Sequence, residues 1–387
     1  MRLKRLYYTT KLMVNNFNNF SAFAFDKNAK NDGIVLVTHE ALRLGASVLL
    51  LNVAKELIEQ GERVYIISLN FGELIEAYKK IAPTQICLTR TSLNSALKKL
   101  AIEYGYSRII VNTVVSAKCV PIAKKCGYKV VSLIHELGSV VQELNAVKEA
   151  RIMIENSDAT VFSTNIAKNE LLKIANPSKG CCFIHPQGIY LKKANGETIN
   201  RYKEEFLRKY PGWMNKQLVV GVGNTTYRKG FDIFLEVAER CPDICFLWAG
   251  AKESHFDKIL KKRSNYIPQN FFYLGNLNSE ELSSVYSMAS LMLVSARHDT
   301  LPSTIFEALS FNVPVIGSKE SGGIVDVIDD TIGLLTDKVD PFEFEKAIKC
   351  ILNERDIKQM VSNIEKLDIS GYSFEAYVTF LNNLFIK

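Results

Sequence analysis

The sequence predicts an α/β protein of two Rossmann-like, doubly wound domains with a ligand cleft between them. Short apolar runs that suit buried strands alternate with longer segments of helical apolar spacing along most of the 387 residues. The alternation breaks around residues 188–216, where Lys, Asn, Gly and Glu dominate. The chain is also longer than one domain usually is. We therefore interpret 188–216 as the link between two α/β domains.

The expected boundaries follow from that break. The first domain covers residues 1–187 and carries an extension at 1–30, and the second covers 188–365. A last helix at 366–387 is expected to return to the first domain. Doubly wound sheets bind ligands at the carboxyl ends of their strands, so two such domains facing each other would hold the ligand in the cleft.

The first domain is predicted to alternate from residue 34 onward. An apolar strand is followed by a loop that contains Gly45, and the helix after it stops at Gly61. The predicted strands are 34–38, 64–68, 85–88, 108–112, 129–134, 159–163 and 182–184, and the later helices are 95–104, 120–126, 146–155 and 166–174.

The second domain is predicted to continue the same alternation. Its strands are 218–222, 244–250, 271–274, 289–294, 313–317 and 333–335, and its helices are 231–241, 279–288, 341–353, 357–367 and 374–385, the last of them returning across the interface. A further short helix is expected just after Pro302, which suits a first turn because proline has no N–H.

The segment 297–318, RHDTLPSTIFEALSFNVPVIGS, is the strongest candidate for a ligand site. Thr304 and Glu307 have the spacing of a capping box at the start of the short helix. A helix start that follows a strand end presents unpaired N–H groups and a partial positive charge, which favours a phosphate. Asp299 and Glu307 can accept hydrogen bonds from sugar and ribose hydroxyls. A glycosidase-like acid pair and a purely structural role are the alternatives.

Three further positions suit the same kind of ligand. Arg228 and Lys229 lie between a strand and a helix, where two cations can neutralise a leaving diphosphate without a metal; a solvated basic turn is the alternative. Gly45 lets the backbone approach a phosphate, or is a plain turn. His135 ends a strand and can bond a sugar hydroxyl or relay a proton, or is a structural histidine.

Composition limits the other classes of function. The formal charge of +7 suits an anionic small substrate or an acidic lipid surface, whereas a nucleic-acid binder needs a basic, aromatic-lined face and the lysines are scattered. The eight cysteines form no metal-binding set, since Cys241 and Cys245 lack a second half, and they suggest buried thiols in a reducing cytosol.

No apolar run is long enough to span a membrane. The basic, aromatic segment 1–30 lacks the apolar region and cleavage site of a secretory signal. We expect it to pack on the first domain as an extra strand or helix, or to lie on a membrane surface.

Taken together, these segments resemble family 4 glycosyltransferases of the GT-B fold over roughly residues 31–387. Residues 299–328, DTLPSTIFEALSFNVPVIGSKESGGIVDVI, are similar to the signature of that family. Further similarities are RKGFD at 228–232, HEL at 135–137, LGAS at 44–47, HPQGI at 185–189 and YLGN at 273–276.

The resemblance assigns roles to the candidate residues. Glu307 would hold the ribose hydroxyls, and Asp299, which stands where Glu is commoner, would contact the donor sugar. His135 would touch the transferred sugar, and Gly45 would approach the donor phosphate or the acceptor. The diphosphate would bind the backbone N–H groups of Leu301, Ser303 and Thr304 and the side chains of Arg228 and Lys229. These two cations match the basic pair of the family only in part, because the position where the family usually has its first Arg is Asn224 in this chain.

The implied reaction is a metal-independent, cofactor-free hexosyl transfer from a UDP- or GDP-sugar to an acceptor hydroxyl, with the anomeric configuration retained. The acceptor would be a glycan or a lipid-linked molecule in bacterial surface polysaccharide synthesis. The protein would be cytoplasmic, with peripheral contact at the inner membrane face. The alternatives are a non-catalytic nucleotide-sugar-binding partner subunit and a GT-B epimerase, for which no suitable acid pair is seen.

Overall fold

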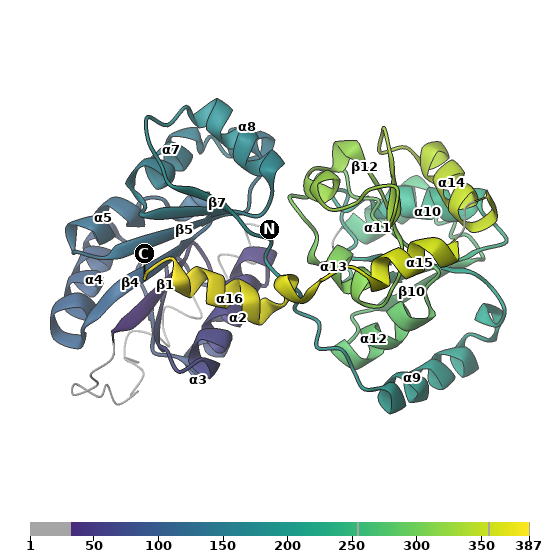
Figure 1. The fold of residues 1–387 in the computed structure, drawn as a ribbon, viewed down its shortest axis with the longest axis horizontal. Helices are drawn as coiled ribbons and strands as arrows, with labels where there is room; N and C mark the ends of the chain where they lie inside the picture. The colour runs from purple at the N-terminus through teal and green to yellow at the C-terminus, as the bar shows by residue number, and fades with distance from the viewer. Residues whose placement is uncertain (1–31, 254, 355–356, 387) are drawn as a thin grey trace. The chain divides into compact units, whose positions relative to one another are not determined.

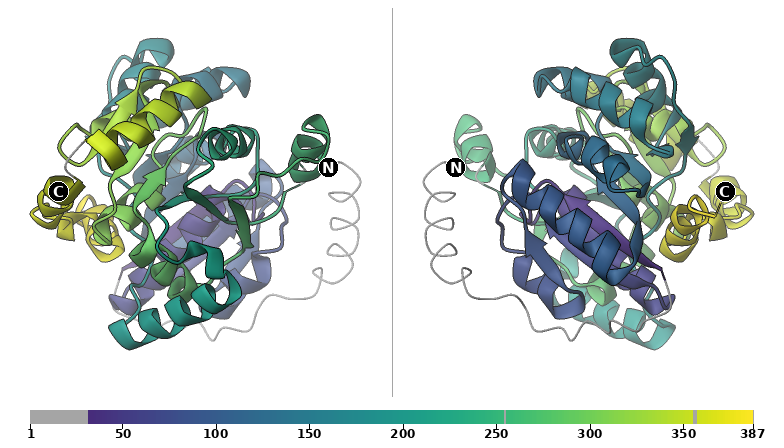
Figure 2. Two further views of the ribbon diagram at one scale, coloured as in Figure 1. Left: turned by 90° about the vertical axis from the view of Figure 1, so that its right-hand side faces the viewer. Right: turned by 90° about the vertical axis from the view of Figure 1, so that its left-hand side faces the viewer.

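The computed structural model describes residues 32–253, 255–354 and 357–386 (Figures 1 and 2). The extension expected at 1–30 lies outside the described residues. The chain divides into two compact units, one ending at Gln187 and rejoined by the segment from Phe374 onward, the other covering Gly188–Ser373.

The first unit is built on one parallel sheet of seven strands. The strand order is β3-β2-β1-β4-β5-β6-β7, the arrangement of a doubly wound domain. The strands are β1 Gly33–Thr38, β2 Arg63–Ser68, β3 Thr84–Ile86, β4 Tyr106–Asn112, β5 Lys129–Ile134, β6 Ala159–Phe162 and β7 Cys182–Ile184. Every residue of β1 is buried, as expected for a central parallel strand covered by helices on both faces.

Within the described residues, seven α helices connect these strands and an eighth returns from the end of the chain. They are α2 Gly45–Glu59, α3 Ile75–Ile81, α4 Arg90–Tyr104, α5 Cys119–Lys125, α6 Gly138–Glu143, α7 Val147–Asn156, α8 Asn165–Ala175 and the returning α16 Phe374–Asn383. The predicted helix at 95–104 begins earlier, because Thr89 and Ser92 form a capping box. The sequence analysis did not predict the short helices α3 and α6.

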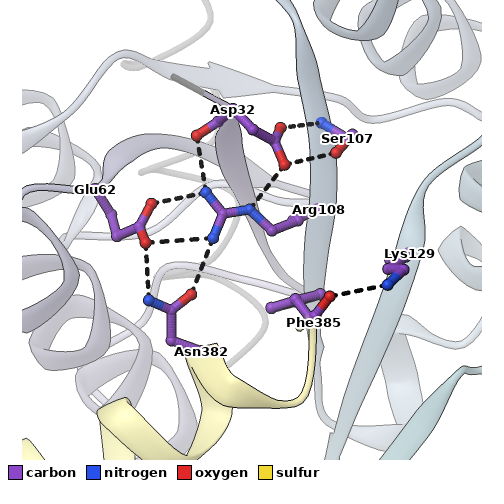
Figure 3. A network of polar contacts seen from close by, with 7 residues as sticks. All are labelled: Asp32, Glu62, Ser107, Arg108, Lys129, Asn382 and Phe385. Atoms are coloured by element: carbon purple, nitrogen blue, oxygen red, sulfur yellow. Dashed lines mark hydrogen bonds and ion pairs between the residues drawn. The ribbon is translucent and has the colours of Figure 1, made fainter. Parts of the chain in front are cut away.

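An arginine at the start of β4 fastens the returning helix α16 to the first unit (Figure 3). The guanidinium of Arg108 bonds Glu62 Oε2 at 2.7 Å, Asp32 Oδ2 at 3.0 Å and Asn382 Oδ1 at 3.0 Å. Asn382 Nδ2 in turn donates to Glu62 Oε1 at 2.8 Å. This network lies at the amino ends of the strands, opposite the edge where such sheets bind ligands, so its role is to hold the fold.

The second unit has a parallel sheet of six strands in the order β10-β9-β8-β11-β12-β13. Alternate residues of β8 enter different clusters, since Val219 packs on one face and Val220 on the other. The strands are β8 Leu218–Val222, β9 Cys245–Ala249, β10 Phe271–Gly275, β11 Leu291–Leu293, β12 Val315–Ser318 and β13 Gly333–Thr336. The α helices are α9 Gly196–Lys209, α10 Phe231–Arg240, α11 His255–Lys262, α12 Ser279–Met288, α13 Ser303–Ser310, α14 Pro341–Lys349 and α15 Ile357–Glu365.

The interpretation of 188–216 as a link is wrong for most of its length, because it contains α9. Asn195 caps this helix by accepting a hydrogen bond from the N–H of Thr198 at 2.8 Å. Phe206 lies against Trp213 in the core, and α9 packs beside α12 (Figure 1). The charged residues that dominate the composition lie on the solvent side of an amphipathic helix, so composition concealed the periodicity.

The second unit also continues past the expected end at residue 365. Met360 and Ile364 of α15 are buried in its core, and Tyr372 stacks on Phe306 with ring centroids 4.4 Å apart. Ile189 pairs with Ser373 in an isolated bridge. The segment 366–373 therefore belongs to the second unit, and the return to the first unit begins at Phe374.

Candidate functional site

The segment between β11 and α13 carries the candidate site in the second unit. Helix α13 begins at Ser303, directly after Pro302. Among the described residues, the backbone N–H groups of Leu301, Ser303 and Thr304 find no acceptor. Three donors at a helix start are thus available to an anion.

The predicted capping box of Thr304 and Glu307 is wrong. The N-cap is Pro302 and makes no side-chain cap, so Thr304 is already the second residue of the helix. Its hydroxyl is buried and has no hydrogen-bond partner within the part of the chain that the structure describes. The proline sets the helix start earlier than the capping pattern implied.

Arg228 and Lys229 converge on Asp299, a pairing that was not predicted from the sequence. Lys229 Nζ forms an ion pair with Asp299 Oδ2, and Arg228 Nη1 lies 3.4 Å from the same oxygen. Arg228 also donates to the carbonyl of His298 at 2.8 Å. Burial acts to raise the pKa of Asp299, but Lys229 and Arg228 outweigh it and hold the pKa below its ordinary value. Asp299 is therefore a carboxylate at neutral pH.

A small cavity lies between Lys229 and the start of α13. It has a volume of about 10 Å³, and its lining includes Lys229, Ser295, Pro302 and Thr304. That volume is close to the least that holds one water molecule. Lys229 thus lies beside the first turn of the helix whose amides are free.

Two glycines allow the loops of the site to meet. Gly230 has φ +68°, and a Cβ at this position would lie 1.8 Å from the carbonyl oxygen of Ser295. Gly322 has φ +114° and pairs with Asp299 in an isolated bridge. The N–H of Asp299 also donates to Ser321 O at 2.7 Å. The position of the Asp299 carboxylate is therefore fixed by its backbone as well as by its cations.

Glu307 lies on α13, and its residue is only 6% exposed. Tyr286 of α12 donates its hydroxyl to Glu307 Oε2 at 3.1 Å, and within the described chain Oε1 has no partner. Burial raises the pKa of Glu307 to about 7, and the bond from Tyr286 lowers it in part. One carboxyl oxygen is thus held by Tyr286 while the other remains available.

Two further residues, Arg297 and Tyr286, contact the candidate site residues or their loops and were not predicted from the sequence. Arg297 Nη1 and Nη2 lie 2.8 Å from the two carboxyl oxygens of Asp232 in the first turn of α10. Arg297 opens the segment 297–318 that was already the strongest candidate for a ligand site, and this position was the available signal for it. No local pattern marks Tyr286, which lies 21 residues from Glu307.

In the first unit, the hydrogen bonds around His135 fix its protonation. The carbonyl of Ala46 can only accept, so the Asn112 atom 2.8 Å from it is Nδ2. Asn112 Oδ1 therefore faces His135 Nε2 at 2.9 Å, and that nitrogen carries the proton. Nδ1 is then an acceptor for Gln187 Nε2 at 2.7 Å. Burial lowers the pKa of His135 to about 4, so the ring is neutral at pH 7.

A second acid lies at the same edge of the sheet. Glu136 accepts the N–H of His135 at 3.0 Å and that of Val114 at 3.3 Å, and burial raises its pKa. Thr113, between β4 and Val114, has φ +69° and lies 3.2 Å from His39 Nδ1 through its hydroxyl. The ends of β1, β4 and β5 are thereby joined by side chains, and one backbone position is strained.

Gly45 does not lie in a loop, as was expected, but is the first residue of α2. It is exposed, and a Cβ there would meet nothing within 4 Å. Packing therefore does not require glycine at this position. The predicted contacts of Gly45 and His135 with a ligand stay predictions.

The described residues contain no group of three or more His, Cys, Asp or Glu side chains placed to hold a metal ion. All eight cysteines are free, and burial raises the pKa of Cys241 to about 11. No described helix combines the length and the apolar character that crossing a membrane requires.

The architecture matches solved proteins along most of its length. The Anabaena protein HepE in complex with UDP superposes with a TM-score of 0.78 at 14% identity, covering 92% of this chain and 99% of that one. Sucrose-phosphate synthase from Thermosynechococcus elongatus gives a TM-score of 0.72 at 17% identity, covering 92% and 98%. At such identities the likeness concerns the fold, and it confirms the predicted α/β architecture of two Rossmann-like domains, the GT-B fold.

The family follows from the sequence of the second unit. Residues 203–367 match the family described as "Glycosyl transferases group 1". The α-galactosylglucosyldiacylglycerol synthase of Streptococcus pneumoniae is 32% identical over 26% of this chain and 28% of its own length. The processive diacylglycerol α-glucosyltransferase of Acholeplasma laidlawii is 27% identical over 45% and 54%. The chain is a GT-B glycosyltransferase homologue whose second domain belongs to the group 1 family. The part of this chain that aligns with these two relatives spans less than two thirds of the length of either one.

Proposed function

We propose that the protein is a retaining glycosyltransferase that moves a hexose-type sugar from a UDP- or GDP-sugar to an acceptor hydroxyl. The observation that carries the proposal is that a basic loop in the second unit reaches the start of a helix whose amides are free. Lys229 lines a small cavity together with Pro302 and Thr304, and Arg228, its neighbour in the chain, pairs with the same Asp299 as Lys229. This is the arrangement that a diphosphate requires.

The residues divide the work of donor binding among them. The amides at the start of α13 and the two cations bind the diphosphate, and they stabilise the charge that builds on it as the sugar leaves. Glu307 accepts the ribose hydroxyls with the oxygen that Tyr286 leaves available. Asp299, held between the cations, accepts a hydroxyl of the donor sugar. Positive charge from side chains and amides takes the place that a metal fills in other transferases.

For the stereochemistry we propose a same-face displacement. The acceptor hydroxyl would attack from the face of the sugar that the phosphate leaves, and the departing phosphate oxygen would take the proton of the acceptor. His135 of the first unit is neutral and both of its ring nitrogens are already bonded, so we do not propose it as the base.

We further propose a glycan or lipid-linked acceptor and a cytoplasmic location with peripheral contact at the membrane. Two relatives carry diacylglycerol in their names, which favours a lipid-linked acceptor for this chain. Structures of Anabaena HepE with UDP and with UDP-glucose support a uridine nucleotide as the donor base. Synthesis of a surface polysaccharide is the pathway class that fits these acceptors.

The test combines donor screening with a double substitution. The protein is incubated with UDP- and GDP-sugars in the presence of EDTA, and slow hydrolysis without an acceptor is measured by release of the nucleotide. We expect one donor to turn over with an α-anomeric product, seen by NMR, and Arg228→Ala with Lys229→Ala to slow turnover at least a hundredfold. Wild-type turnover in the double variant refutes the assignment, and tight binding without turnover indicates a non-catalytic nucleotide-sugar-binding subunit.

A further inference from the structure

We propose that Arg297 is a positioning residue for the diphosphate site, acting by fixing the loop that carries Arg228 and Lys229. The inference rests on the proposed function, because it names the residue that holds that site in shape. Arg297 itself touches no predicted ligand atom.

The contacts of Arg297 fall on both sides of the two cations. Its guanidinium binds both carboxyl oxygens of Asp232, which follows them, at 2.8 Å each. Its Nη1 also donates at 2.7 Å to the carbonyl of Tyr227, which precedes them. The backbone N–H of Arg297 donates to the carbonyl of Arg228 at 2.8 Å. The guanidinium carbon lies 3.6 Å from the centre of the Tyr227 ring.

Ser295 Oγ already ties this loop to the segment after β11 by donating to the carbonyl of Gly230 at 3.0 Å. The contacts of Arg297 add hydrogen bonds at Tyr227 and Arg228, before Lys229. Gly230 adopts a left-handed conformation, and the Arg228 side chain is 55% exposed. Lys229 can bind both Asp299 and an incoming phosphate only while the loop keeps its distance from α13. A misplacement of about 1 Å at a catalytic group can cost a hundredfold in rate.

These contacts require the planar guanidinium of arginine, which presents several N–H donors in fixed directions. One guanidinium serves two carboxyl oxygens, a carbonyl and a ring face at once, whereas a lysine ammonium is a point charge that cannot span them. The pair with Asp232 is about a quarter exposed on each side, so the ion pair alone stabilises the fold little. Its effect is therefore on the geometry of the loop.

The other end of α10 supplies a matched control. Arg240 pairs with Glu236 at 3.5 Å and with Glu345 at 3.4 Å, and neither ion pair involves the loop of residues 226–230. Arg240→Ala removes two ion pairs, though longer ones than those of Arg297, from the same helix. A general loosening of α10 would appear in both variants, and a displaced diphosphate site only in Arg297→Ala.

The experiment measures affinity for UDP and for uridine by calorimetry, or for GDP and guanosine if the wild type prefers guanine. Arg297→Ala should weaken the diphosphate at least tenfold and the nucleoside less than twofold. Arg297→Lys should recover little, and Arg240→Ala should bind like wild type. In the Arg228→Ala, Lys229→Ala background, adding Arg297→Ala should cost less than a further twofold, because Arg297 acts through those two residues.

The outcomes separate the inference from the proposed function. Equal losses for diphosphate and nucleoside, full additivity with the double variant, or unchanged binding in Arg297→Ala overturns the role of Arg297 alone. A wild type that binds no nucleoside diphosphate overturns the proposed function and with it this inference. If Arg297→Ala does not fold, Asp232→Asn removes the charge of its partner and undergoes the same comparison.

Discussion

Replacing Glu307 by Gln should change how the stability of the protein depends on pH. Burial gives the Glu307 carboxyl a pKa of about 7 in the folded protein, against 4.5 when it is exposed. Between these values the unfolded chain releases its proton while the folded protein keeps it. Folded protein is therefore stabilised by this group below pH 4.5, and the contribution is lost as pH rises through 7.

The magnitude follows from the two pKa values. Each pKa unit corresponds to about 1.36 kcal/mol, so between pH 5 and pH 8 the wild type loses about 2.5 kcal/mol of unfolding free energy through this carboxyl. The amide introduced by Glu307→Gln does not ionise, and its oxygen can still accept from Tyr286. The N–H groups of the new amide change the unfolding free energy by an amount that does not depend on pH, and this amount cancels when the change from pH 5 to pH 8 is compared between the two proteins. The variant should thus gain about 2.5 kcal/mol on the wild type across that range.

The assay is urea unfolding of both proteins at pH 5, 6, 7 and 8. In thermal melts of the same proteins, the expected change between pH 5 and pH 8 corresponds to several degrees in Tm, at about 2–4 °C per kcal/mol for a domain of this size. For the control Glu103→Gln, at an exposed position of α4, the plot of unfolding free energy against pH should run parallel to that of the wild type. If the plot for Glu307→Gln also ran parallel to the wild type, the Glu307 carboxyl would ionise normally, and the argument from burial would be refuted. The same variant should bind the donor more weakly, which makes stability and function oppose each other here.

Three further predictions address the charges around the two sites. Asp299→Asn should bind UDP about tenfold more tightly, since a negative charge beside the phosphates is removed, yet it should transfer sugar more slowly. Calorimetry measures the affinity for UDP and a turnover assay measures the rate of transfer. Weaker binding of UDP would contradict the predicted gain in affinity. Arg108→Ala should lower the unfolding free energy by about 2–4 kcal/mol and speed amide exchange in α16, because Glu62 and Asn382 lose their bonds to the guanidinium. Lys124→Ala, which removes an exposed ion pair, should cost under about 1 kcal/mol, and equal costs for the two variants would contradict the prediction. Asn112→Asp should raise the pKa of His135 above its value of about 4, because a carboxylate stabilises the imidazolium, and NMR titration of the ring would show no change if the bond were absent.

The sequence was sufficient for the alternating architecture and for the local part of the site. Short strands such as β1 and β5 are mostly apolar, so their positions were predicted to within a residue. Residues 299–307 are close in sequence, and a strand followed by a short helix places them together. Helix α9 was missed because most of its surface faces solvent and its charged residues resemble those of a loop.

Contacts between distant segments could not be predicted in the same way. Arg297 meets Asp232 across 65 residues and Tyr286 meets Glu307 across 21, and each pairing depends on how the strands order themselves in the sheet. The hydrogen bonds of His135 depend likewise on β4, on α2 and on Gln187, three separate segments. Periodicity identifies which residues face a sheet, but not which side chain they meet there.

The charge balance of the second unit connects these observations. Before a donor arrives, Asp299 already neutralises part of the charge on Lys229 and Arg228. A diphosphate must therefore share the cations with a carboxylate that cannot leave, since its backbone is pinned to Ser321 and Gly322. The free amides of α13 supply the positive potential that the carboxylate has removed from the side chains. Binding then depends on the position of the loop that carries the cations, and the contacts of Arg297 gain importance because Lys229 and Arg228 must serve Asp299 and the phosphates from one position of that loop.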